Sequence, residues 1–149
     1  MSATIMSSNM ATLTFIEGII PGPDGPTMNT KVDINRDGKM NVKRKIHHTD
    51  ADYIEAKGQL NASEIRLLTV ELRRLFALPC SPTPGSDDIY HCDTAIKVTL
   101  TDGTVWSNYQ EGARPHDPSR IRPSDSQVDE FSSIMVAIKQ LVKKVPLIR

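Results

Sequence analysis

The stretch from Asn61 to Tyr109 constrains the fold most, because it joins a capped amphipathic helix to a β-hairpin. Asn61 can cap the helix while Glu64 reaches back to the N–H of the cap, a variant of the capping box. Apolar residues then recur at spacings of three and four, and Pro79 cannot continue the helix. This breadth of apolar surface predicts a well-buried helix. Its apolar residues are Ile65, Leu68, Leu72 and Leu75, widened by Leu67, Val70, Phe76 and Leu78.

The segment 94–109 alternates apolar and polar residues on both sides of an Asp-Gly turn, which predicts a hairpin. Two registers are open. A two-residue turn pairs Leu100 with Val105 and places Trp106 on the face opposite Val98. A three-residue turn that includes the preceding threonine pairs Val98 with Trp106 and sends the indole inward. We expect a core tryptophan, and a partly exposed Trp106 at a binding face is the alternative.

The segment 28–46 predicts an earlier hairpin, whose register follows from its apolar residues. A two-residue turn would set Ile34 against Asn41, which matches an apolar residue with a polar one. A three-residue loop instead makes every cross-strand pair on one face apolar, with Gly38 in the left-handed conformation. That loop is Arg36, Asp37 and Gly38, and the pairs are Ile34 with Met40, Val32 with Val42, and Met28 with Ile46.

The same hairpin resembles part of a calcium loop of the EF-hand or dockerin type. The twelfth position of such a loop should be a bidentate acid, and here it is Arg44. A cation at that position repels calcium, so we prefer the hairpin and expect no bound metal. Calcium remains the alternative, with Asp33, Asn35, Asp37 and Asn41 as its candidate ligands.

The basic residues of segment 39–45 have two interpretations. A solvated edge strand is the simpler one, because lysines discourage the pairing of sheet edges. A patch for an anionic partner is the other, although no aromatic residues are interleaved for stacking on nucleic acid. The residues concerned are Lys39, Lys43, Arg44 and Lys45.

The rest of the chain predicts one domain of α+β class. Its fold class is a small, mainly antiparallel sheet, in the order strand, hairpin, helix, hairpin, helix, with two helices packed on one face. Residues 1–11 predict a disordered tail, and 12–149 the domain. The domain begins with a short strand over 12–20 that turns Leu13, Phe15 and Ile19 inward. It continues with a polar crossing at 47–58, a polar, proline-rich surface loop at 110–124, and a last helix capped by Ser124 or Ser126.

Composition bears mainly on what the chain binds. Lysine and arginine together equal aspartate and glutamate at 18 each, so no basic excess indicates nucleic acid or a membrane surface. No apolar run approaches the roughly 18 residues of a membrane span, and the start resembles no signal peptide, so we expect a cytoplasmic protein. Cys80 and Cys92 are then reduced thiols, with a bridge between them as the alternative. No phosphate loop, nucleophile motif or metal triad indicates an enzyme or a cofactor.

The layout over about residues 28–145 resembles the emfourin family, small bacterial inhibitors of protealysin-type, thermolysin-like metalloproteases. The resemblance rests on Leu75-Phe76-Ala77-Leu78-Pro79, the proline-containing loop, Asp88-Ile89-Tyr90, Ile96-Lys97-Val98 and Asp102-Gly103. The family's Gly-Gly-Phe-type turn has only one glycine here, and the insertion before the last helix is atypical. The resemblance implies a protein-binding module that inhibits a metallopeptidase, as a monomer or weak homodimer, without a cofactor. The candidate partner-binding residues are Arg36, Asp37, Gly38, Lys39, Asp87 and Asp88.

Overall fold

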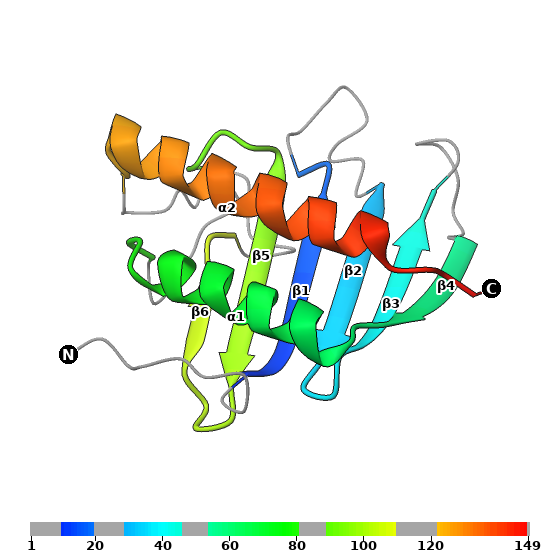
Figure 1. Cartoon of the computed structure of the whole chain (residues 1–149). Coiled ribbons are helices and arrows are strands. Elements are labelled where there is room, and N and C mark those ends of the chain that lie inside the picture. The colour runs from blue at the N-terminus through cyan, green and yellow to red at the C-terminus, as the bar shows by residue number, and fades with distance from the viewer. Residues whose placement is uncertain (1–9, 20–28, 46–53, 81–88, 110–121, 149) are drawn as a thin grey trace.

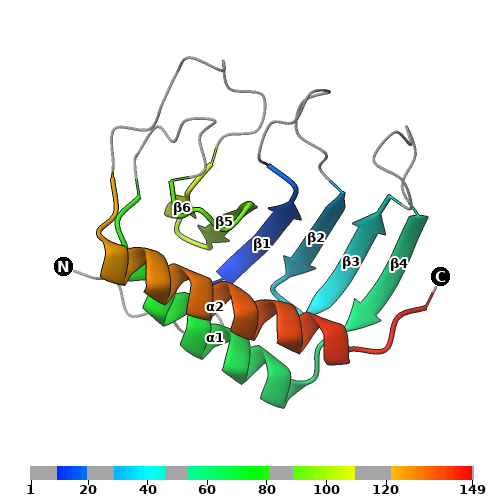
Figure 2. The same ribbon diagram turned by 90° about the horizontal axis from the view of Figure 1, so that it is seen from above.

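The computed structural model describes residues 10–19, 29–45, 54–80, 89–109 and 122–148. They form a six-stranded antiparallel sheet in the order β4-β3-β2-β1-β5-β6. Both helices lie on one face of this sheet and run antiparallel to each other (Figures 1 and 2). The expected α+β class is confirmed. The elements are β1 (Met10–Glu17), β2 (Thr30–Asn35), β3 (Lys39–Arg44), β4 (Ile54–Gln59), α1 (Ala62–Phe76), β5 (Thr94–Leu100), β6 (Val105–Ser107) and α2 (Asp125–Lys144).

Both hairpins have the longer loop that their apolar residues favour. In the first, Ile34 pairs with Met40, and the φ angle of Gly38 is +81°. In the second, Val98 pairs with Trp106, so the tryptophan turns toward the helices and is buried. The first register confirms the loop length that its apolar pairs predict, and the second is the register that makes Trp106 a core residue, as expected. The expected pair of Met28 with Ile46 lies outside the described residues.

Each helix begins at a capping box. The Asn61 side chain accepts from the Glu64 N–H, and the Glu64 carboxylate accepts from the Asn61 N–H. Ser124, rather than Ser126, makes the same reciprocal pair with Gln127 at the start of α2. These caps satisfy N–H groups that have no partner within the helix, so each helix start is fixed by local sequence.

The core lies between the sheet and the two helices. Tyr90 and Phe131 stack with ring centroids 4.3 Å apart, and both side chains are fully buried. The indole N–H of Trp106 donates to Leu78 O at 3.0 Å, and the Tyr90 hydroxyl donates to Pro79 O. Trp106 of the second hairpin and Tyr90 just before that hairpin therefore hold the exit of α1, because these buried aromatic donors find their acceptors there.

The main correction to the expected fold is β4. Residues 47–58 were expected to cross from the first hairpin to α1 as a polar segment. Residues 54–59 instead form a strand that pairs with the whole of β3. As a result β3 lies inside the sheet and β4 is its edge, so the interpretation of 39–45 as an edge strand is wrong.

The breadth of the buried face of α1 was also overestimated. Leu68, Leu72 and Leu75 are buried, but Leu67 is 57% exposed and Val70 is 49% exposed. At about 100° per residue, Val70 falls on the side of the helix opposite the buried stripe, and Leu67 falls roughly a right angle away from it. One side of α1 packs against the sheet, so apolar residues on the other side cannot be buried by it.

The remaining expectations concern the ends of the chain and its loops. β1 begins at Met10, so residues 10 and 11 belong to the sheet and not to a tail. The expected inward side chains Leu13, Phe15 and Ile19 are all buried. Positions 1–9, 81–88 and 110–121 lie outside the described residues. Neither α1 nor α2 is long and apolar enough to cross a membrane.

Candidate functional site

The turn between β2 and β3 carries most of the sequence-predicted binding residues that the structure describes. Arg36, Asp37 and Lys39 are exposed there, whereas Gly38 between them is buried. The side-chain oxygen of Asn35 accepts from the N–H groups of both Asp37 and Lys39, each at 3.0 Å. These bonds hold the loop closed from within, so its three charged side chains project from a fixed backbone.

The same turn is also anchored to the segment that leads into α1. The Leu60 N–H donates to Gly38 O at 2.9 Å, and the Gln59 side-chain amide donates to Asp37 O at 2.8 Å. A Cβ atom on Gly38 would lie 2.9 Å from Ile65 Cδ1 and 3.0 Å from Leu60 O. A side chain at position 38 would therefore be crowded at this contact, and the positive φ angle favours glycine as well.

The turn of the second hairpin lies at the same end of the sheet. Figure 1 shows both turns at this end, because β2 and β5 are both antiparallel to β1 and flank it. The Thr104 N–H donates to Asp102 at 2.8 Å and, with the Thr104 hydroxyl, lowers the pKa of Asp102. A Cβ atom on Gly103 would have no other atom within 4 Å, so this glycine, unlike Gly38, does not pack against another part of the described chain.

The candidate calcium ligands lie in the first hairpin. Three of them, Asp33, Asn35 and Asn41, line a hollow of about 480 Å³ on the face of the sheet away from the helices, and Lys39 and Lys57 line it too. The Asn35 oxygen already accepts two N–H groups, and Asp33 accepts from a threonine hydroxyl.

One oxygen in this hollow, Asn41 Oδ1, is buried and has no hydrogen-bond partner among the described residues. In the part of the chain that the structure describes, no three histidine, cysteine or acidic side chains cluster in a way that could hold a metal. Calorimetric titration with calcium would test the alternative directly. Micromolar binding that disappears in Asp37→Ala would establish a calcium site.

The basic residues of 39–45 do not share one face. Successive residues of a strand point to opposite sides, so Lys39 and Lys43 lie on the open face of the sheet. Arg44 points to the opposite face of the sheet, the face on which the two helices lie, but Arg44 itself is exposed. Lys43 is also the cross-strand partner of Glu55. The segment therefore offers an anionic partner a narrower basic surface than its sequence suggests.

Cys80 and Cys92 are half-buried thiols, and no disulfide joins them. They lie near Tyr90, whose pKa is raised to about 12 by burial and, to a smaller extent, by the charge of Cys80. A phenol with so high a pKa stays protonated at neutral pH and cannot act as a base there. It serves the fold, as the hydroxyl that binds Pro79 O.

Sequence reasoning missed the residues that make the first turn rigid. Gln59 and Leu60 lie more than 20 positions away along the chain, and their contact with the turn depends on the unexpected strand β4. Asn35 was considered only as a metal ligand. One local signal was available: an asparagine side chain often accepts a hydrogen bond from the backbone N–H two residues later, and here that residue is Asp37, next to the turn glycine Gly38. The two other candidate residues, Asp87 and Asp88, lie outside the described residues.

Comparison with known proteins identifies no family for this chain. No protein-family model matches it, and no curated protein matches its sequence.

Proposed function

We propose that the chain is a protein-binding module whose contact surface is the first turn, with Arg36, Asp37 and Lys39 as the contacting side chains. The observation that carries the proposal is the anchoring of that turn. Its backbone is held by Asn35 from within and by Gln59 and Leu60 from outside. Exposed charges on a fixed backbone are what a binding surface requires.

Preorganisation is the physical reason why such a turn would bind well. A flexible loop loses conformational entropy when a partner fixes it, and this loss subtracts from affinity. The anchored turn has already lost that entropy on folding.

Inhibition of a thermolysin-like metallopeptidase is the concrete form of the proposal. The turn would enter the cleft of the enzyme, where Asp37 could approach the metal while Arg36 and Lys39 meet acidic groups. A rigid turn resists the extended conformation that a peptidase needs for cleavage, so the chain would inhibit rather than be cut. This form rests on the emfourin resemblance, and binding alone remains if the resemblance fails.

Binding rather than catalysis, and a cytoplasmic location, are parts of the same proposal. Cys80 and Cys92 are thiols in the structure, as they would be in a reducing compartment. A protein partner is expected, with no cofactor and no nucleic acid.

The test is residual activity of a thermolysin-like peptidase from the same organism against rising concentrations of this chain. We expect inhibition that weakens when Arg36, Asp37 and Lys39 are all changed to alanine. Arg73→Ala is the matched control, because Arg73 is an exposed arginine about two turns further along α1 than Ile65, which lies against Gly38. Gly38→Val should also weaken inhibition, because a β-branched residue resists positive φ.

Two outcomes would count against the proposal. No inhibition of any such peptidase would remove the inhibitor function and leave a binding module without a known partner. Inhibition that is unchanged by the triple alanine variant and by Gly38→Val would move the contact surface away from the first turn. The segment from Pro82 to Asp88 would then be the next candidate.

A further inference from the structure

Within the described residues, the outer edge of the sheet at β4 is only partly covered. Lys57 exchanges two hydrogen bonds with Ile148: its N–H donates to Ile148 O at 2.8 Å, and its carbonyl accepts from the Ile148 N–H at 2.7 Å. Backbone groups of alternate residues point the same way, so Glu55 and Gln59 also direct theirs to this edge. The segment after α2 thus adds a single bridged residue to β4.

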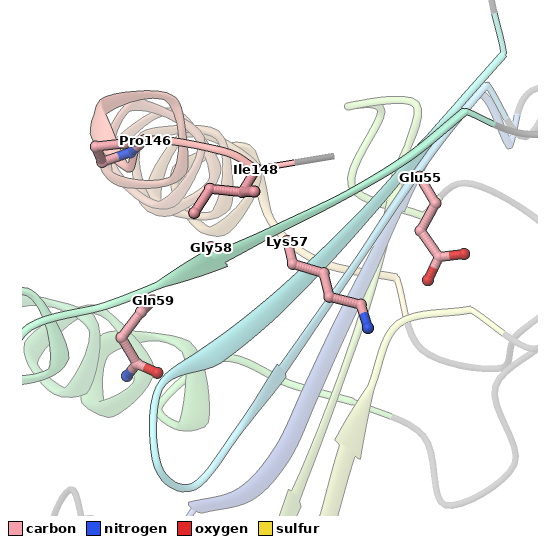
Figure 3. Close-up of a pocket in the computed structure, with 6 residues that line it drawn as sticks. All are labelled: Glu55, Lys57, Gly58, Gln59, Pro146 and Ile148. Carbon is pink, nitrogen blue, oxygen red and sulfur yellow. The ribbon is translucent and has the colours of Figure 1, made fainter.

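That bridge cannot extend in the direction of α2. In its register Gln59 stands opposite Pro146, which has no N–H to donate. Ile148 is itself 76% exposed, so little apolar burial holds it in place. A cavity of about 840 Å³ lies along the edge, lined in the described residues by Glu55, Lys57, Gly58, Gln59, Pro146 and Ile148. Figure 3 shows this cavity.

The side chains along the edge alternate in charge on one face. Figure 3 shows Glu55, Lys57 and Gln59 on the side of β4 away from α2, and all three are exposed. Two copies of β4 paired antiparallel about Ala56 would place Glu55 of each copy directly opposite Lys57 of the other. A shift of the two-fold axis by one residue either way would instead oppose two lysines or two glutamates. Opposite charges directly across a strand pair stabilise it, and like charges destabilise it.

We propose that the β4 edge pairs with the β4 edge of a second copy of this chain, and that the bridge between Lys57 and Ile148 competes with that pairing. The two sheets would then join into one continuous sheet. Charge selects the register centred on Ala56, in which both Glu55–Lys57 contacts form.

The other face of β4 suits the same register. There Ala56 would meet Ala56 of the second copy, and Ile54 would lie opposite Gly58 of the other copy. Gly58 has no side chain, and Leu147 now lies 3.1 Å from its Cβ position. When the C-terminal segment leaves the edge, Ile54 of the second copy fills the space that Leu147 vacates. In the dimer, Ile54 of the second copy thus replaces Leu147 as the apolar side chain that contacts Gly58.

Competition by the bridge keeps the pairing weak in the intact chain. Two copies would give up four bridge hydrogen bonds, two in each, and would form four between Lys57 and Glu55 across the new pair. Because the exchange is neutral in hydrogen bonds, only the charge pairs and apolar contacts favour the dimer. Weakening the bridge should therefore strengthen self-association directly.

The first experiment measures the dimer dissociation constant by sedimentation equilibrium for the wild type, Ile148→Pro and Ile148→Ala. Proline removes the N–H that donates to Lys57 O, whereas alanine keeps both bridge bonds and serves as the matched control. We expect Ile148→Pro to dimerise roughly tenfold more tightly or better, since each copy no longer gives up that bond. Ile148→Ala should stay close to the wild type. An Ile148→Pro chain that is folded by circular dichroism but associates no more tightly would overturn the proposal.

The second experiment tests the register by charge reversal in the Ile148→Pro chain. If Ile148→Pro does not fold, the same variants can be compared in the wild-type chain at high concentration. Lys57→Glu alone opposes glutamates, and Glu55→Lys alone opposes lysines, so each variant should associate less tightly than its parent. Mixed in equal amounts, the two variants form both opposite-charge contacts again, and we expect the association to return. A mixture that associates no better than the separate variants would refute the β4 pairing.

Discussion

Replacing Gly38 with alanine tests how tightly the first turn is seated. Two costs add at this position. A non-glycine residue at positive φ costs about 1–2 kcal/mol. The new Cβ would also lie 2.9 Å from Ile65 Cδ1 and 3.0 Å from Leu60 O, and overpacking of this kind costs roughly 1–3 kcal/mol. We expect Gly38→Ala to lower the free energy of unfolding by about 2–5 kcal/mol.

Gly103→Ala separates the two costs, because Gly103 has a φ angle of +90° but no atom near its Cβ position. It should lose only the backbone part, about 1–2 kcal/mol. The two atoms that the new Cβ would crowd, Ile65 Cδ1 and Leu60 O, differ in how easily they can move. The Ile65 methyl can rotate away, whereas Leu60 O accepts no shift without straining the main chain that anchors the turn.

The assay is urea unfolding followed by circular dichroism, with the free energy taken from the midpoint and slope of each curve. The expected result is that Gly38→Ala is more destabilising than Gly103→Ala by at least about 1 kcal/mol. Equal losses at the two glycines would refute the reasoning, because they would mean that the first turn is not packed against Leu60 and Ile65.

Three further predictions concern the core and the charged groups. Leu72→Ala should cost roughly 2–5 kcal/mol in the same unfolding assay, while Leu67→Ala on the exposed side of α1 should cost under about 0.5 kcal/mol. A hydrogen bond from Arg74 lowers the pKa of Glu130. Ionised Glu130 therefore stabilises the fold at pH values above 4.5, its ordinary pKa, and this stabilisation is lost as the pH falls through the lower pKa of the folded state. The stability difference between wild type and Glu130→Gln should therefore be present at pH 7 and vanish in acid. Burial raises the pKa of Tyr90 from 10.0 to about 12, so the free energy of unfolding should decline as the pH rises over that range. An alkaline absorbance titration should find one tyrosine that ionises near pH 12, and this transition should be absent in Tyr90→Phe.

Both hairpins could be predicted because their information is local. The register of the first follows from apolar residues that must face the same side, with a glycine at the turn, and that of the second from the expected burial of Trp106. The helix starts were equally local, since a capping box lies within four residues. These features read directly from the sequence because no distant residue decides them.

The strand β4 could not be predicted from its own residues, for a reason that the structure makes plain. Its inward positions include Ala56 and Gly58, which give almost no apolar alternation. Gly58 is small because Val145 and Leu147 fill the space beside it, and a Cβ there would lie 2.8 Å from Val145 Cγ1. Partners almost 90 positions away set this requirement. The anchoring of the first turn was missed with it, because Gln59 and Leu60 reach the turn only when β4 is a strand.

The most direct test of the proposed binding surface is an amide NMR titration of the labelled chain with a thermolysin-like peptidase from the same organism. We expect the largest shifts or line broadening to fall on Arg36, Asp37, Gly38 and Lys39. Changes confined to exposed residues of α1 and α2, with the first turn unaffected, would contradict it.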